Sequence, residues 1–434
     1  MKWLRQRMFG SLRTGTAEVE RQNIAWNMIG SLIYAGSSMI LTALVNHLIG
    51  PEQGGIFGFA FSAFGQQMFL VAYFGMRPFQ STDVNQAYTF GEYRRVRLYT
   101  CMAAVIFGII YIFVNSFIVP DGYSRQKTVV VFLMVIYKVL DGFADVYESE
   151  FQREGRLYLT GKAMAYRTIL SVILFLGALY ATQDLVFSCV IAVLAQAAGI
   201  LLFDWNTMKL VPGVNLSRAA GKSLALIRES FLLFLSVFLD GLIFAMAKYA
   251  VDAQMTSMDT AIFVAVFMPT SVINLAANFV IRPFLTKMSY QWEEKKFVEF
   301  TRDLKRLVAI ILVLTVIALA GAWAIGVPVL GAISNVELAP YKSGLLYIIL
   351  GGGFFAVMNL FYYVLVIMKC QRRIFFGYVP VCLLSVVLSF LLVKIGGING
   401  GAFSYMLEML VLMMCFMGQA FYVFHRAKKQ QGGC

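Results

Sequence analysis

The sequence predicts an all-α, polytopic membrane protein of about twelve transmembrane helices, and composition and segment length both support this fold class. Of its 434 residues, 60% are hydrophobic and 14% are charged, and the mean hydropathy is +0.75. A soluble core cannot bury so large an apolar fraction. Stretches such as 96–119 and 304–327 carry scarcely a charge, over the length that a helix rising about 1.5 Å per residue needs to cross about 30 Å of hydrocarbon.

Hydropathy divides the chain into about twelve segments of this kind. In chain order they are 23–50, 54–76, 96–119, 128–149, 160–180, 184–206, 229–252, 257–281, 304–327, 343–368, 374–394 and 398–424.

The net charge of +13 follows from the membrane topology. With both termini in the cytoplasm, nearly all of the 36 Lys and Arg residues fall in inner segments, which is the bias that orients membrane proteins. Arg97 and Arg167 are counted among these inner charges, whereas Lys138 and Lys248 fall within helices. We therefore expect a multi-pass protein of the bacterial cytoplasmic (inner) membrane, and no nucleic-acid partner.

A repeated signal predicts that the chain has two similar halves. Arg77-Pro78-Phe79 ends the second predicted helix and Arg282-Pro283-Phe284 ends the eighth, and a basic segment and another apolar run follow each. We predict an N-terminal six-helix bundle at 1–210 and a C-terminal six-helix bundle at 211–434. Because six is even, the copies share one orientation, so a pseudo-two-fold along the membrane normal is expected.

Four ionisable residues share one face of the fourth predicted helix. Lys138, Asp141, Asp145 and Glu148 follow each other at helical spacing and fall within a stripe of roughly 80°. A charge at mid-bilayer costs about 2.5–3.5 kcal/mol on insertion scales, so this stripe is not expected to face lipid. One interpretation is a hydrated cavity that binds a polar headgroup or a coupling ion. The alternative is that Lys138 pairs with Asp141 and that the lower acids reach the interface.

The second half carries its own intramembrane charges. Asp240 and Lys248 fall in the seventh predicted helix, and Glu408 falls in the twelfth. These residues could line the same kind of cavity, or Lys248 could pair with Asp252 one turn away.

The sequence contains none of the motifs that would indicate an enzyme. It lacks GxxxxGK[ST], HExxH and GxSxG, and its two histidines are isolated, so no ATP-driven, zinc or serine chemistry is expected. The predicted outer loops are short, and the cysteines form no CxxC pair. We therefore expect no catalytic residue, metal site or cofactor.

Short segments along nearly the whole chain resemble the Wzx-type polysaccharide flippases of the multidrug/oligosaccharidyl-lipid/polysaccharide exporter superfamily. The segments that carry this resemblance are Asn27–Ser31, Leu48–Gly55, Phe74–Arg77 leading to Asp83, Asp145–Leu157, Lys248–Asp252, and Phe267–Pro269 with Ile273–Leu275. One departure is that Ala247 precedes Lys248, where this group often has proline.

The resemblance implies a two-lobed bundle that works by alternating access. It also implies an undecaprenyl-pyrophosphate-linked oligosaccharide as substrate, protons or sodium as coupling ions, and membrane lipids, a polysaccharide polymerase and glycosyltransferases as partners. On this hypothesis Arg77, Lys138, Lys248 and Arg282 bind the pyrophosphate, and Asp141, Asp145, Asp240 and Glu408 serve ion coupling.

Three other functions remain open from the sequence. A cation-coupled multidrug exporter of the same superfamily would account for the excess of deep acids over deep lysines. A membrane polysaccharide polymerase or ligase and a passive scaffold are the remaining alternatives.

Overall fold

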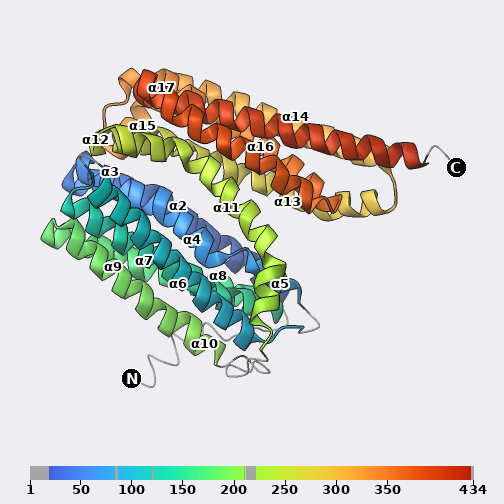
Figure 1. The fold of residues 1–434 in the computed structure, drawn as a ribbon, viewed down its shortest axis with the longest axis horizontal. Helices are drawn as coiled ribbons and strands as arrows, with labels where there is room; N and C mark the ends of the chain where they lie inside the picture. The colour runs from blue at the N-terminus through green and yellow to red at the C-terminus, as the bar shows by residue number, and fades with distance from the viewer. Residues whose placement is uncertain (1–18, 84–86, 120–121, 210, 212–220, 432–434) are drawn as a thin grey trace. The chain divides into compact units, whose positions relative to one another are not determined.

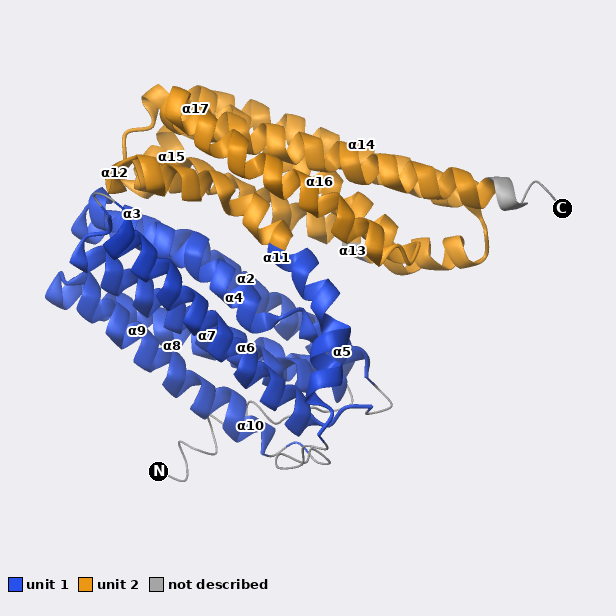
Figure 2. Ribbon diagram, in the orientation of Figure 1, with its two compact units in different colours: residues 1–238 blue, residues 239–434 orange. Residues whose placement is uncertain are grey.

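The computed structural model describes residues 19–83, 87–119, 122–209, 211 and 221–431, and within them every regular element is helical (Figure 1). The chain divides into two compact units, residues 1–238 (unit 1) and 239–434 (unit 2), coloured separately in Figure 2.

Unit 1 is a helical bundle. Its helices are α2 (Val19–Ile49), α3 (Pro51–Phe59), α4 (Gly65–Tyr73), α5 (Met76–Thr82), α6 (Phe90–Phe113), α7 (Arg125–Arg153), α8 (Leu157–Thr182), α9 (Leu185–Gly199), α10 (Asn206–Met208) and the first part of α11 (Ser223–Gln254), with π-helical turns at Ala60–Phe64, Val114–Ile118 and Ile200–Trp205.

Unit 2 is a second bundle. It holds the rest of α11, then α12 (Ser257–Phe267), α13 (Pro269–Glu293), α14 (Phe297–Gly321), α15 (Val327–Ser334), α16 (Lys342–Ile367) and α17 (Gln371–Gln431), with a π-helical turn at Ala322–Gly326 and a 3₁₀ turn at Ala339–Tyr341.

Local sequence explains where several helices begin. Thr89 and Glu92 form a capping box at the start of α6, and Ser124 accepts a hydrogen bond from the backbone of Lys127 at the start of α7. These side chains satisfy backbone N–H groups that have no partner inside the helix. Pro269 opens α13, where its fixed φ and missing N–H are tolerated.

The prediction of an all-α protein with about twelve membrane helices is confirmed. Within the described residues, ten helical segments are long and apolar enough to cross a membrane. Two of the predicted helices are merged in α17, which has non-helical backbone angles at Gly397. The fourth predicted helix corresponds to α7, which is 29 residues long and carries the charged stripe.

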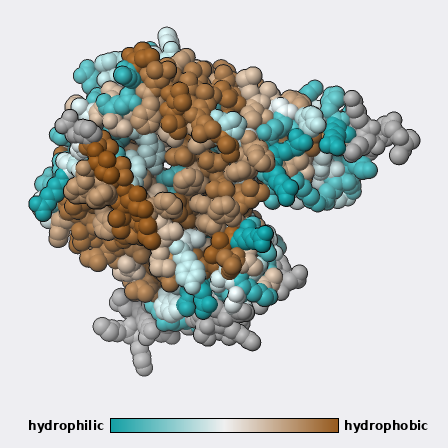
Figure 3. Space-filling view, in the orientation of Figure 1, coloured by the Kyte–Doolittle hydropathy of each residue, from teal (hydrophilic) through white to brown (hydrophobic). Residues whose placement is uncertain are grey.

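The surfaces of both units suit a lipid environment. Large apolar side chains are exposed along the helices, for example Ile106 and Phe107 on α6 and Val316 and Ile317 on α14. Figure 3 shows hydrophobic residues over much of the visible surface and hydrophilic residues towards the helix ends. Because lipid tails are as apolar as these side chains, their exposure costs little in a membrane.

The two compact units divide inside α11, whereas the sequence predicts a boundary between 210 and 211. The first part of α11 packs within unit 1, because Phe234 stacks on Phe74 at a ring separation of 4.4 Å and Gln67 donates a 2.9 Å hydrogen bond to the carbonyl of Phe238. The predicted boundary at 210 lies outside the described residues. The predicted pseudo-two-fold stays a prediction.

One close helix contact organises unit 1. A Cβ atom on Gly161 of α8 would lie 2.0 Å from the carbonyl oxygen of Trp26 on α2. The absence of a side chain therefore lets the two backbones meet, as small residues allow in membrane bundles.

Candidate functional site

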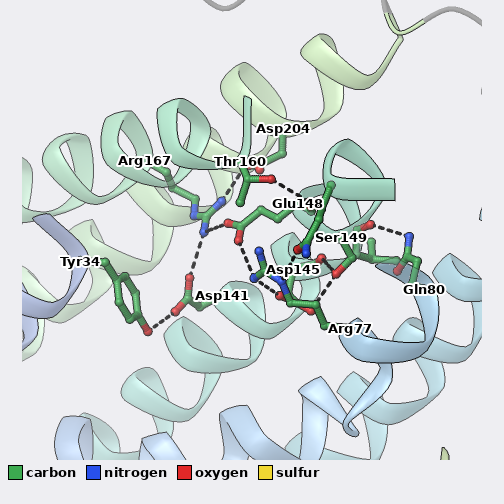
Figure 4. Close-up of polar contacts among 12 residues, drawn as sticks. Tyr34, Arg77, Gln80, Asp141, Asp145, Glu148, Ser149, Thr160, Arg167 and Asp204 are labelled. Carbon is green, nitrogen blue, oxygen red and sulfur yellow. Dashed lines mark hydrogen bonds and ion pairs between the residues drawn. The ribbon is translucent and has the colours of Figure 1, made fainter. Parts of the chain in front are cut away.

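The charged face of α7 lies inside unit 1. Lys138, Asp141, Asp145 and Glu148 are between 2% and 5% exposed. Their spacing of three, four and three residues aligns them along the helix, and the neighbouring helices supply their partners. In Figure 4 these partners converge on the carboxylates from several elements.

Arg167 of α8 holds three carboxylates together. Its guanidinium lies 2.7 Å from Asp204, 2.8 Å from Glu148 and 3.1 Å from Asp141. Arg167 is 2% exposed, so water cannot replace these contacts. A planar guanidinium with five donors is suited to bridging several carboxylates.

Asp145 is bound by two further arginines. Arg77 of α5 lies 2.8 Å from Asp145 and 3.4 Å from Glu148, and Arg97 of α6 lies 2.8 Å from the other oxygen of Asp145. The Arg97 side chain is fully buried, whereas that of Arg77 is 27% exposed. Arg77 is thus the member of this group that a ligand could reach.

A left-handed turn places Arg77 beside the acids. Phe74 and Gly75, which separate α4 from α5, have φ angles of 53° and 63°. Glycine adopts this region freely, but phenylalanine is strained there. The stacking of Phe74 on Phe234 holds the turn in place.

Tyr34 links Lys138 to the acids. Its hydroxyl donates a 2.6 Å hydrogen bond to Asp141 and lies 3.4 Å from Lys138 Nζ. The Lys138 ammonium also lies 4.1 Å from the ring centroid of Phe61. Among the described residues no carboxylate lies within 4 Å of Lys138 Nζ, so the alternative of a direct Lys138–Asp141 ion pair is not observed.

We call these contacts the unit 1 network. Its members are Tyr34, Arg77, Arg97, Lys138, Asp141, Asp145, Glu148, Arg167 and Asp204.

The sequence prediction was wrong for Arg97 and Arg167, which it counted as cytoplasmic topology charges. Both are buried in the unit 1 network, because Arg97 lies two turns inside α6 and Arg167 lies well inside α8. The sequence could have identified Arg167 as a buried charge, because it falls within the predicted span 160–180. Asp204, within the predicted span 184–206, was missed in the same way.

Unit 2 contains Lys248, Asp240 and Glu408, none of which pairs with an arginine among the described side chains. The Lys248 ammonium lies 4.3 Å from the ring centroid of Phe267 and is 7% exposed, with no carboxylate within 4 Å of its Nζ in the described part of the chain. Asp240 Oδ1 is buried and has no hydrogen-bond partner in the described part of the chain.

Glu408 is also buried in unit 2. It is fully buried, and its Oε1 accepts a 2.6 Å hydrogen bond from Ser389. Arg282 lies in α13, and its side chain is outside the described ones.

No metal site is visible in the described residues. No three His, Cys, Asp or Glu side chains among them lie in an arrangement that could hold an ion. The carboxylates of the unit 1 network form ion pairs with arginine side chains instead.

Comparison with known proteins identifies the fold. No protein-family model matches the sequence, and no curated protein matches it. Among solved structures, one similar chain is a multidrug resistance MATE family transporter of the MOP superfamily in an inward-facing conformation. The two chains share 13% identity, with a TM-score of 0.66 over 93% of this chain and 99% of the other.

Two further structures are similar. A eukaryotic MATE transporter matches with 12% identity and a TM-score of 0.63 over 94% of this chain and 99% of its own. A MOP superfamily transporter from Pyrococcus furiosus, described as having a binding pocket of reverse polarity, matches with 12% identity and a TM-score of 0.55 over 94% and 96%. The chain therefore has the MATE-like transporter fold, with two bundles.

Proposed function

We propose that this protein is a transporter that moves an undecaprenyl-pyrophosphate-linked oligosaccharide from the cytoplasmic to the outer face of the membrane by alternating access. The observation that carries the proposal is a pair of buried lysines, Lys138 in unit 1 and Lys248 in unit 2. Each contacts aromatic rings and neither has a carboxylate within ion-pair distance in the described residues.

The energetics of these lysines favour an anionic ligand. A lysine at mid-bilayer costs about 2.5–3.5 kcal/mol on insertion scales, and a desolvated cation–π contact returns about 2 kcal/mol. The remainder can be offset by an anion that enters during the transport cycle. Phosphate oxygens are strong acceptors for ammonium and guanidinium groups, so a lipid pyrophosphate has the required chemistry.

Arg77 is the proposed entry contact for the pyrophosphate in unit 1. It is partly exposed and already bound to Asp145 and Glu148. An incoming phosphate that took over the Arg77 guanidinium would leave these acids less compensated, which favours uptake of a proton or a sodium ion. Such an exchange would couple ligand binding at Arg77 to ion binding at Asp145, with Asp141 in the same network.

We assign the remaining roles as follows. Lys138, Lys248 and Arg282 complete the substrate contacts, and Asp240 and Glu408 provide ion coupling in unit 2. A polysaccharide polymerase and glycosyltransferases are the expected partners, because they make the substrate and consume the product.

A cation-coupled multidrug exporter is the second candidate. It is favoured by the similarity to a multidrug resistance MATE transporter. Asp240 and Glu408 also favour it, because each has a carboxylate oxygen with no hydrogen-bond partner among the described residues. A cationic drug would pair with such acids, whereas it would be repelled by Lys138 and Lys248.

Transport into proteoliposomes separates the two candidates. Wild-type protein should move labelled lipid-linked oligosaccharide, and Lys248→Met or Lys138→Met should abolish this movement at unchanged protein level. The matched control is Lys394→Met, which removes an exposed lysine of unit 2 and should transport normally. Normal transport by the Lys248 variant would refute its role, and extrusion of cationic dyes in place of the lipid would favour the drug exporter.

We further propose that the protein resides in the bacterial inner membrane with both termini in the cytoplasm. A green fluorescent protein fused to the C-terminus should fluoresce, and an alkaline phosphatase fused there should be inactive. The reverse result would invert the proposed topology.

A further inference from the structure

Glu408 is a buried acid in a pocket of neutral groups. It lies on the second helix of α17 and is fully buried. Its Oε1 accepts a 2.6 Å hydrogen bond from Ser389, whose hydroxyl lies 3.2 Å from Ser404 Oγ. Its Oε2 is buried and has no hydrogen-bond partner in the described residues.

Among the described residues, the titratable and charged groups around Glu408 do not include a compensating cation. On α17 itself these groups are Cys382 and Tyr405, both of which interact electrostatically with Glu408. From α11 comes Asp240, which interacts with the same Tyr405 hydroxyl. The lysine of α11, Lys248, lies over the ring of Phe267 instead.

Tyr405 holds the second buried polar atom that lacks a partner. Its hydroxyl has no hydrogen-bond partner in the part of the chain that the structure describes. Its ring packs edge-on against Phe267 at 4.7 Å and against Phe244 at 5.7 Å. The ring is therefore fixed, while the hydroxyl hydrogen remains free to rotate.

These two unpaired atoms are informative because an ionised carboxylate accepts hydrogen bonds and cannot donate them. An isolated buried carboxylate costs far more than a neutral acid, so a group without a cation is stable when a proton neutralises it. When the proton leaves, the Ser389 hydroxyl already donates to the carboxylate and lowers that cost.

We propose that Glu408, with Ser389, is a proton-binding site of unit 2. The Glu408 carboxyl carries the proton in the described conformation. On release the O–H bond breaks, its electron pair stays on the carboxylate oxygen, and a water molecule takes the proton as hydronium. Ser389 is a positioning residue whose hydrogen bond stabilises the ionised form. The site's use in coupling rests on the proposed transport function, whereas proton binding by Glu408 does not.

Infrared spectroscopy of the purified full-length protein tests proton binding without transport. The wild type should show the carbonyl stretching band of a protonated, buried carboxylic acid, and part of this band should be lost in Glu408→Gln. Glutamine keeps the shape and removes the titrating group. The control Glu337→Gln changes an exposed acid of unit 2 and should leave the band intact. An unchanged band in Glu408→Gln would overturn the proposal.

Transport measured with and without a pH gradient tests coupling. Wild-type protein should transport faster with the gradient than without it, and Glu408→Gln should lose this acceleration. Ser389→Ala should retain the infrared band and shift the pH at which it disappears. Equal acceleration of wild type and Glu408→Gln, or acceleration that needs a sodium gradient, would overturn the coupling role. Absence of lipid transport by the wild type would refute the proposed function and leave the infrared test standing.

Discussion

Replacing Arg167 by methionine should destabilise unit 1 strongly. Arg167 is 2% exposed and contacts three carboxylates at 2.7 to 3.1 Å. Removing one partner of a buried ion pair typically costs about 3–5 kcal/mol, because the remaining charge is left uncompensated. Methionine has similar length and no donor, so the variant tests the charge and not the packing.

The three acids should not contribute equally to this cost. Asp141 keeps its hydrogen bonds from Tyr34 and Gln196, and Glu148 keeps Arg77. Among the described residues, no side chain other than Arg167 bonds to Asp204, and its second oxygen already lacks a partner.

Asp204→Asn in the Arg167→Met background should therefore recover roughly half of the lost stability, within the coupling energies of about 0.5–3 kcal/mol seen for contacting residues. Asp141→Asn should recover less.

The assay is reversible unfolding of purified protein in mixed micelles by titration with a denaturing detergent. The four combinations of wild-type and substituted residues 167 and 204 form a double-mutant cycle. If Arg167→Met unfolds at the wild-type midpoint, the carboxylates are not charged in the folded protein. If Asp141→Asn restores as much stability as Asp204→Asn, the inferred distribution of contacts is wrong.

Three backbone features give further predictions. Gly161→Ala should lower the amount of protein in the membrane, because its Cβ would lie 2.0 Å from a carbonyl oxygen of α2. The control is Gly177→Ala, where the added Cβ would meet open space. Equal amounts of both variants would contradict the prediction. Gly397→Ala should cost about 1–3 kcal/mol on unfolding because φ there is 54°, whereas Gly396→Ala should cost little. Thr89→Ala should cost about 1 kcal/mol through loss of the capping box, measured by the same titration; no loss would show that the cap is dispensable.

The fold class and the charged faces of single helices could be predicted from the sequence alone. A long apolar run crosses lipid as a helix, because the helix pairs every backbone N–H and C=O group within the segment itself. The helical period then placed Lys138, Asp141, Asp145 and Glu148 on one face of α7. Both conclusions depend on local sequence, so no tertiary information was needed.

Which partners those residues have was decided only by tertiary structure. Arg167 and Asp204 lie on helices that hydropathy alone describes as apolar spans, and Arg97 lay at the end of a span where a topology charge is expected. Periodicity gives the direction of a side chain from its own helix axis, but it does not say which neighbouring helix packs on that face. Three arginines from different helices meet the acids of α7 because the bundle brings distant segments together, and short-range pattern cannot encode that contact.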